Sequence, residues 1–515
     1  MSIPYAKPPV GELRFKKPES PERWSNVRDC SKLPPRCPHY DMYHEKVTVN
    51  IPKSEDCLYL NVFTPGVVGE EKTNLPVMLY IHGGAFVVHS ASHLGDKNIC
   101  RYLCQKDVII VTINYRLGFF GFMTTADPSC PGNFAFWDMH KALQWVQDNI
   151  EYFGGDKDNV TIFGQSAGGA SADFLALSPH TQNLFKRYIA MAGTAYATHS
   201  RTTSKRLREE WIHYAEKVLG FKCNKDKKKE KIDEELLTFL RSQPAHKLEL
   251  SMLPDKRITI TPDGRLRVAP VVDGDFFPKD FLELRKEMPR KDVLAGVTQW
   301  EGLLFMLLKP SYKTFAKSLM VGTLSKYKLD KPVEEYVEKA YSTFVDVTKP
   351  ENSLEHKQQL AKVISDVMYN NNCRHFAEST MKNGSKVFLY TFEYCRPNVG
   401  GFLGYMFPFK GATHTIEVAY LFGKCITSTH FTPSPADLKV IDRYTTYFTN
   451  FAKYGDPNGQ VPEEAKKWLP LTEDHAERNL VIKEKEDTMQ EEFFEGRYRK
   501  WLEVWPDVCE MKLAE

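Results

Sequence analysis

One short segment of the chain places a serine between glycines at the end of an apolar run. Residues 161–170 read TIFGQSAGGA, in which Gly164, Ser166 and Gly168 match the pattern G-x-S-x-G. In this pattern a strand turns sharply into a helix and exposes the serine hydroxyl at the edge of a sheet. A helix beginning at Ala167 would aim backbone N–H groups at the place where an oxyanion forms. The segment predicts Ser166 as a nucleophile and Ala167 as an oxyanion donor.

A second glycine pair, upstream of the serine, has the composition of an oxyanion loop. Residues 81–86 read IHGGAF and follow an apolar run. Loops of this HGG type supply backbone N–H groups beside a serine nucleophile. We therefore expect Gly83 and Gly84 to act with Ala167. A surface serine in a Gly-rich connection is the alternative for the five-residue pattern alone, and the glycine loop favours the catalytic interpretation.

The elements around these motifs repeat an order of strand, turn and helix. The runs 76–81, 108–113 and 160–163 are continuously apolar and rich in β-branched residues, and residues 135–150 have helical spacing. Such runs are typical of strands buried on both faces. We expect an α/β fold, a large and mostly parallel sheet flanked by helices. Further helices are expected near residues 203–218, 233–241, 354–370 and 437–453.

Composition and charge exclude several classes of function. Hydrophobic residues make up 42% and charged residues 26%, and the net charge is +3. This charge is too mild to predict binding to nucleic acid, and the mixed-sign segment 225–231 indicates a solvated loop. The apolar segments 75–88 and 107–122 are interrupted by His, Gly, Asn and Arg, so membrane insertion is not expected. No Gly/Ser linker divides the chain, and one domain over residues 1–515 is expected.

The cysteines and the first residues bear on cofactors and compartment. None of the eleven cysteines stands in a CxxC or Cys/His zinc spacing, so neither a metal nor another cofactor is expected. Residues 1–15 carry prolines where a signal peptide would have its apolar core. The sequence as it stands predicts a cytoplasmic protein. The state of Cys37 and Cys57 depends on the compartment.

Ordered motifs along almost the whole chain resemble those of the type-B carboxylesterase and cholinesterase family of α/β-hydrolases. The matching segments are residues 3–15 (IPYAKPPVGELRF), 54–61 (SEDCLYLN), 114–118 (NYRLG), 131–133 (PGN), 153–156 (FGGD) and 450–458 (NFAKYGDPN). The resemblance implies an α/β-hydrolase fold and a serine carboxylesterase that hydrolyses carboxylic esters through an acyl-enzyme. A small-molecule ester is the expected partner, while the oligomeric state stays open.

The resemblance also implies the partners of the serine. The acid would be Glu301, in GVTQWEG (296–302), and the base His414, in GATHTIE (411–417). The order Ser, Glu, His agrees with that of α/β-hydrolases. Glu417 would help to orient the histidine without reacting itself. A non-catalytic adhesion or binding protein on the same fold is the alternative, and it is disfavoured because that branch typically loses the nucleophile.

Other positions depart from the family pattern and narrow the substrate. Cholinesterases hold a quaternary ammonium on a tryptophan, but residues 41–50 contain none and only Tyr43 is aromatic. Residues 264–270 read GRLRVAP, without the bulky phenylalanines of a narrow acyl pocket. General carboxylic esters are therefore expected rather than choline esters. Gln165 replaces the more common Glu, and Ala192 replaces a supporting serine.

Three disulfides are common among secreted relatives, and the resemblance implies only one here. Cys37 and Cys57 are both kept, whereas Cys223 and Cys373 lack their partners, the latter needing a cysteine near Tyr498. This favours a reducing compartment. The chain starts inside the family pattern, so the strands that usually come first are expected to be missing. With an incomplete N-terminus, a secreted or endoplasmic-reticulum protein would be the alternative.

Overall fold

A single twisted sheet forms the centre of the computed structural model, which describes residues 1–41, 51–66, 73–251, 268–307, 309–397, 399–425, 427–428 and 431–514. Its ten described strands lie in the order β1-β2-β4-β3-β5-β6-β7-β8-β9-β10. They are β1 (Ile3–Pro4), β2 (Tyr59–Phe63), β3 (Leu75–Ile81), β4 (Ile109–Ile113), β5 (Gly155–Gln165), β6 (Arg187–Met191), β7 (Val293–Thr298), β8 (Val387–Phe392), β9 (Asn479–Ile482) and β10 (Thr488–Gln490).

The sheet is parallel at its centre and antiparallel at its margins. All neighbours from β4 through β9 run parallel. The pairs β1–β2, β2–β4 and β9–β10 are antiparallel. Every residue of β4 and β6 is buried, as expected for strands that helices cover on both faces. The three apolar runs coincide with β3, β4 and β5, so the predicted α/β fold is confirmed.

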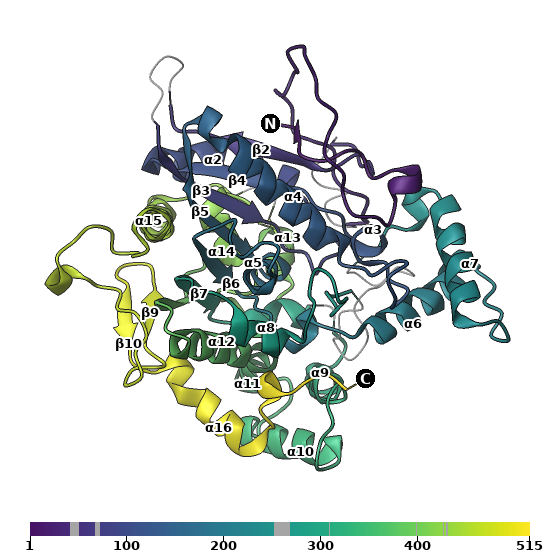
Figure 1. Ribbon diagram of the computed structural model, residues 1–515. Helices are drawn as coiled ribbons and strands as arrows, with labels where there is room; N and C mark the ends of the chain where they lie inside the picture. Colours follow the sequence, from purple (N-terminus) through teal and green to yellow (C-terminus); the bar gives the residue numbers. More distant parts are fainter. Residues whose placement is uncertain are drawn as a thin grey trace.

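Helices cover both faces of the sheet (Figure 1). On one face α5 packs on β5 and β6, and α12 packs on β7 and β8; on the other, α15 packs on β3 and β5. Each face has its own apolar core. The described helices are α2 (Lys97–Tyr102), α3 (Gly118–Phe122), α4 (Phe134–Asn149), α5 (Ala167–Leu177), α6 (Ser204–Tyr214), α7 (Lys229–Ser242), α8 (Phe281–Glu287), α9 (Tyr312–Leu324), α10 (Val333–Phe344), α11 (Leu354–Ser365), α12 (Asn371–Lys382), α13 (Gly401–Tyr405), α14 (Ile416–Phe422), α15 (Pro435–Tyr454) and α16 (Arg497–Val504).

Local sequence signals explain where the longest helix begins and ends. At the start of α15 the Ser434 side chain accepts from the Asp437 N–H, and the Asp437 carboxylate accepts from the Ser434 N–H. This reciprocal capping box satisfies two N–H groups that a helix terminus leaves unpaired. Gly455 ends the helix at φ 70°, a conformation that favours glycine. The predicted helix at residues 437–453 is thus confirmed.

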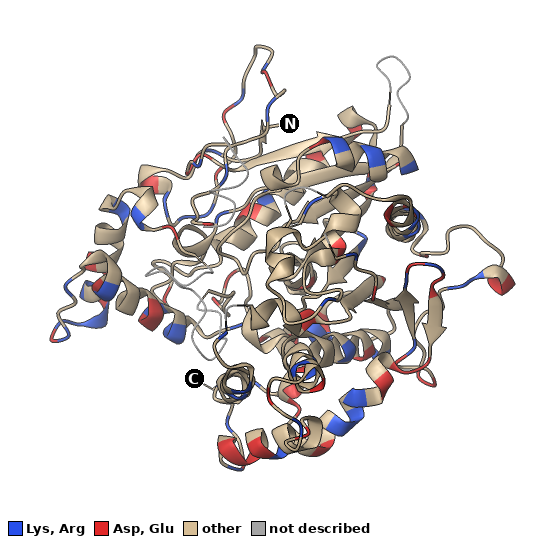
Figure 2. Ribbon diagram, turned by 180° about the vertical axis from the view of Figure 1, so that it is seen from behind, with Lys and Arg blue, Asp and Glu red and all other residues tan. Residues whose placement is uncertain are grey.

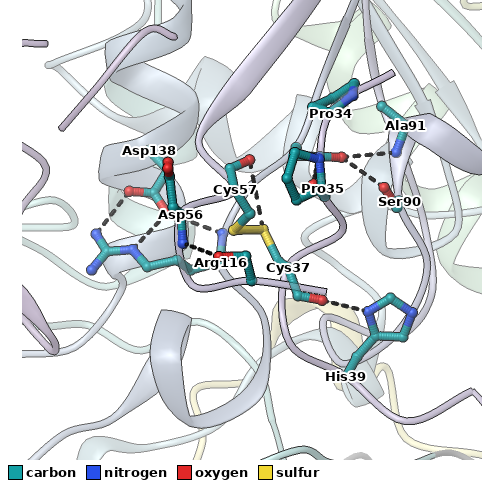
Figure 3. Close-up of a disulfide and its surroundings, with 12 residues drawn as sticks. Pro34, Pro35, Cys37, His39, Asp56, Cys57, Ser90, Ala91, Arg116 and Asp138 are labelled. Atoms are coloured by element: carbon teal, nitrogen blue, oxygen red, sulfur yellow. Dashed lines mark hydrogen bonds and ion pairs between the residues drawn. A yellow bond between two sulfur atoms is a disulfide. The ribbon is translucent and has the colours of Figure 1, made fainter. Parts of the chain in front are cut away.

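A disulfide joins Cys37 to Cys57 next to strand β2. Figure 3 shows it together with the buried ion pair in which Arg116 donates from Nε and Nη2 to both oxygens of Asp138. This is the pairing that the family resemblance implies. Cys223 is a free thiol, as its missing partner predicts.

Charged side chains are spread over the surface. Figure 2 shows Lys and Arg interspersed with Asp and Glu. The segment 225–231 is exposed throughout, and at its end on α7 Lys229 pairs with Asp127 and Asp233 and Lys231 pairs with Glu234. These pairs support its interpretation as a solvated segment. Across the described residues, no helix has both the length and the apolar character needed to span a bilayer.

Candidate active site

The register of the parallel strands brings the ends of several strands to one edge of the sheet. Ile81 of β3 lies opposite Gly164 of β5. Gln165 lies opposite Met191 of β6, and Met191 lies opposite Gly296 of β7. Because these strands are parallel, the loops that follow them start side by side. The glycine loop, the serine turn and the loop carrying Glu301 therefore meet.

The serine turn has the geometry that its glycines predict. Ser166 lies between β5 and α5 at φ 58° and ψ −126°, a strained conformation for a residue with a side chain. A Cβ on Gly168 would lie 2.0 Å from the Ile81 carbonyl oxygen, so only glycine allows α5 to pack this close to β3. The turn therefore places Ser166 just beyond the end of β5.

Ser166, His414 and Glu301 form a continuous chain of hydrogen bonds. The Ser166 hydroxyl lies 2.8 Å from Nε2 of His414, and Nδ1 of His414 lies 2.5 Å from Oε2 of Glu301. The other carboxylate oxygen, Oε1, accepts from the Thr298 N–H at 2.6 Å. Glu301 is 0% exposed and His414 3% exposed. Both oxygens of the carboxylate are engaged, which fixes its plane and that of the imidazole.

Hydrogen bonds between two loops distant in sequence fix His414 and Glu301 relative to each other. The Trp300 N–H donates to the Ala412 carbonyl at 2.8 Å. The Thr413 hydroxyl donates to the Trp300 carbonyl at 3.0 Å and accepts from the Leu304 N–H at 2.8 Å. The residues that flank Glu301 and His414 are thus joined directly. The hydrogen-bonded chain rests on backbone geometry as well as on side-chain packing.

The glycine loop lies against the serine. A Cβ on Gly83 would lie 3.2 Å from the Cβ of Ser166, and Gly84 adopts φ 109°, which side chains rarely tolerate. Ala167 is the first residue of α5, where backbone N–H groups have no partner within the helix. Gly83 and Ala167 therefore lie next to Ser166, and Gly84 follows Gly83 in the same loop.

Glu417 is a buried carboxyl group on α14, three residues after His414 in the sequence. Its pKa is raised well above the ordinary value, mainly by burial and further by the nearby Glu301 carboxylate; the Gln165 side chain offsets this only in part. The shift favours the protonated, neutral form of Glu417. With Gln165, which is neutral, in place of a glutamate, a third carboxylate is also avoided.

Replacing Glu417 with glutamine tests this protonation state. Because the folded-state pKa is raised, the wild-type protein loses stability as the pH rises above about 4.5, where the unfolded chain ionises. Glutamine does not titrate. The melting temperature of Glu417→Gln relative to wild type should therefore increase between pH 5 and pH 8 in thermal unfolding scans. A difference that stays constant or shrinks over this range would show that Glu417 is ionised in the folded protein.

An aromatic group that sequence patterns did not indicate stacks on His414. The Tyr369 ring lies 4.5 Å from that of His414 at 28°, with its hydroxyl 3.4 Å from Nε2. Phe305 and His199 pack against Tyr369. Tyr369 lies in the π-helical turn η9 (Asp366–Asn370), which interrupts the helix predicted at residues 354–370. Such turns are frequent at functional sites, but this sequence carries no clear signal for one.

The parts of the sequence expected to shape the substrate pocket lie largely outside the described residues. Tyr43 and residues 264–267, including Leu266, fall in this category. Ala192, which stands where many relatives have a serine, is described and buried at φ 46° directly after β6. Its N–H donates to the Gly296 carbonyl at 2.8 Å, so the backbone there is fixed without a hydroxyl group.

The fold and these side chains define an α/β-hydrolase. The model of the Carboxylesterase family matches residues 1–501, and the chain belongs to that family. It is 39% identical over 503 residues to Esterase cest-33 of Caenorhabditis elegans, covering 96% of this chain and 88% of that protein. It is 33% identical to the medium-chain fatty acyl-CoA hydrolase precursor of Anas platyrhynchos, and the match covers 100% of this chain and 88% of that protein. These relatives support a carboxylic ester hydrolase.

A further relative is not named as an esterase. Human Neuroligin-2 is 31% identical over 520 residues, covering 90% of this chain and 58% of that longer protein. The family therefore includes proteins not named as esterases. Membership alone does not decide between catalysis and binding, and the side chains at the serine turn carry the distinction.

Proposed function

We propose that the chain hydrolyses carboxylic esters through an acyl-enzyme, with Ser166 as nucleophile, His414 as general base and Glu301 as the acid that orients the imidazole. The observation that carries the proposal is the unbroken hydrogen-bonded chain from the Ser166 hydroxyl to the Glu301 carboxylate. A hydroxyl is a weak nucleophile until a base within hydrogen-bond reach takes its proton. His414 Nε2 lies within that reach.

The first half of the reaction forms the acyl-enzyme. Ser166 Oγ attacks the ester carbonyl carbon as its proton passes to Nε2 of His414. Glu301 accepts from Nδ1–H, which keeps Nε2 free to act as a base and stabilises the imidazolium that forms. His414 then donates the proton to the leaving alcohol oxygen, and the C–O bond of the ester breaks.

The oxyanion of the tetrahedral intermediate would be bound by the N–H groups of Gly83, Gly84 and Ala167. Each such donor is typically worth about 3 kcal/mol of barrier reduction. In the second half of the reaction, water replaces the serine as the attacking group. His414 takes a proton from the water and returns it to Ser166 Oγ, which releases the carboxylic acid.

Adhesion without catalysis is the second candidate, and the match to Neuroligin-2 is the observation behind it. It is disfavoured because all three side chains of the proposed triad are present and hydrogen-bonded in the productive order. Purified protein should hydrolyse p-nitrophenyl butyrate with saturation kinetics. A folded preparation without turnover on several short-chain esters would favour the binding protein instead.

For the substrate class, we propose general carboxylic esters over choline esters. Support comes from the absence of tryptophan in residues 41–50 and of phenylalanine in residues 264–270. An aromatic cage contributes about 2 kcal/mol or more to holding a desolvated quaternary ammonium. We therefore expect kcat/KM for a butyrate ester to exceed that for acetylthiocholine by at least about tenfold. A strong preference for acetylthiocholine in parallel assays would contradict this substrate class.

A further inference from the structure

Away from the proposed triad, three side chains able to bind a metal ion meet between helix α12 and a C-terminal turn. His375 lies on α12, Cys509 lies on the 3-10 turn η12 (Val508–Glu510), and Asp507 caps that turn. One atom from each, a nitrogen, a sulfur and a carboxylate oxygen, lie within 4.8 Å of one another. Within the part of the chain that the structure describes, this is the one group of at least three such residues with this spacing.

The C-terminal turn directs its carboxylate toward the histidine. Asp507 Oδ1 accepts from the Cys509 N–H at 3.2 Å, which leaves Oδ2 3.8 Å from Nδ1 of His375. Ligand atoms around tetrahedral Zn²⁺ lie about 3.4 Å apart, given metal–ligand distances of about 2.0 to 2.3 Å. Small side-chain rotations would therefore let the imidazole and the carboxylate share one ion.

Cys509 supplies the donor that selects the metal. Its sulfur is buried and lies 3.4 Å from Oδ1 of Asn372, one helical turn before His375 on α12. Burial is the main cause that raises the pKa of the Cys509 thiol. A coordinating thiol loses its proton to the solvent, and the thiolate is a ligand that Zn²⁺ accepts readily.

The groups around these three residues suit a bound cation. Glu510 Oε1 lies 2.8 Å from Nε2 of His375, so a carboxylate faces the ring nitrogen opposite Nδ1. This arrangement orients metal-bound histidines. The Tyr498 hydroxyl lies 3.2 Å from Nδ1. Arg201 donates from Nη2 to the Val508 carbonyl at 3.2 Å, which fixes the C-terminal turn.

We propose that His375, Asp507 and Cys509 bind one Zn²⁺ ion, which joins the C-terminal turn to α12. A thiolate, an imidazole and a carboxylate match Zn²⁺, whereas Mg²⁺ and Ca²⁺ prefer oxygen ligands alone. The spacing of cysteines and histidines in the sequence predicts no metal, since His375 and Cys509 come from segments far apart in the chain.

Cobalt substitution in the full-length protein tests the site without any mutation. Chelator-treated protein, kept under nitrogen, is titrated with Co²⁺ and followed by visible and near-ultraviolet absorption. We expect saturation at about one ion per chain, with the visible bands of tetrahedral Co²⁺ and a thiolate-to-cobalt charge-transfer band. Added Zn²⁺ should abolish the visible bands and the charge-transfer band. It should also raise the melting temperature of the chelator-treated protein by about 2 to 5 °C.

Two variants show whether the bands come from this cluster. Cys509→Ala should lose the charge-transfer band, and the milder Asp507→Asn, at a partly exposed side chain, should weaken Co²⁺ binding at least about tenfold. Cys130→Ala removes another buried free thiol and should behave as wild type. The proposal is overturned if wild-type protein shows no charge-transfer band, or if the band persists in Cys509→Ala. A melting temperature that Zn²⁺ leaves unchanged would likewise overturn the proposal, and His375 would then contact Glu510 without an ion.

Discussion

Replacing Ser166 with alanine is expected to lower kcat for p-nitrophenyl butyrate by about 10⁴- to 10⁶-fold. The hydroxyl is the atom that forms the acyl-enzyme, and no other group in the hydrogen-bonded chain can take its place. The oxyanion donors of the glycine loop remain in the variant, so a small residual rate is expected. Steady-state kinetics on the purified variant, with circular dichroism to verify folding, measures the effect.

Ser171→Ala provides the matched control for this variant. Ser171 lies on α5, which begins directly after Ser166. It is fully buried, whereas Ser166 is partly exposed, and its hydroxyl donates to the Ala167 carbonyl at 2.7 Å. It takes no part in the proposed chemistry, so its kcat should stay within about threefold of wild type. Turnover that survives Ser166→Ala at a comparable rate would contradict the assignment of the nucleophile.

Replacing Glu301 with glutamine is expected to lower kcat by about 10⁴-fold with little change in KM. The Thr298 N–H requires an acceptor, so the amide oxygen should face Thr298 and the amide NH₂ should face His414. Nδ1 must then accept a hydrogen bond, which moves the proton to Nε2. The imidazole in this tautomer cannot take the proton of Ser166. The fold should be kept because the two side chains have nearly the same shape.

Glu417→Gln is the matched control for Glu301→Gln. It changes a second buried carboxyl group of the site, but one whose raised pKa favours the neutral form. We expect a loss of less than about tenfold in kcat. Comparable losses in the two variants would show that burial of a carboxyl group, rather than its hydrogen bond to His414, governs activity. A Glu301→Gln enzyme within tenfold of wild type would contradict the role of Glu301.

Much of the fold was predictable because its signals are local. The apolar runs that became β3, β4 and β5 are continuous, and strands covered on both faces need no alternation of polar residues. The serine turn was predictable from Gly164 and Gly168, since the packing at that point excludes any side chain. Glu301 and His414 came from the family resemblance, because single residues in separate loops carry no local pattern.

Other features depend on contacts between distant segments, and the sequence did not reveal them. The stacking of Tyr369 on His414 follows from a π-helical turn whose cause lies in packing rather than in residue type. The raised pKa of Glu417 follows from its burial and then from the nearby Glu301, and only the folded chain shows both. The meeting of His375 with Cys509 depends on where the C-terminal turn docks. Each is a property of the folded chain rather than of a sequence motif.

Identifying the residue that reacts with an active-site probe tests the central claim most directly. The purified protein is treated with a fluorophosphonate, digested and analysed by mass spectrometry. The proposed mechanism predicts one phosphonylated residue, Ser166, with labelling in step with loss of p-nitrophenyl butyrate turnover. Labelling should also slow markedly in Glu301→Gln, because the same base activates the serine. An adduct on another residue, or full inactivation without modification of Ser166, would contradict the account.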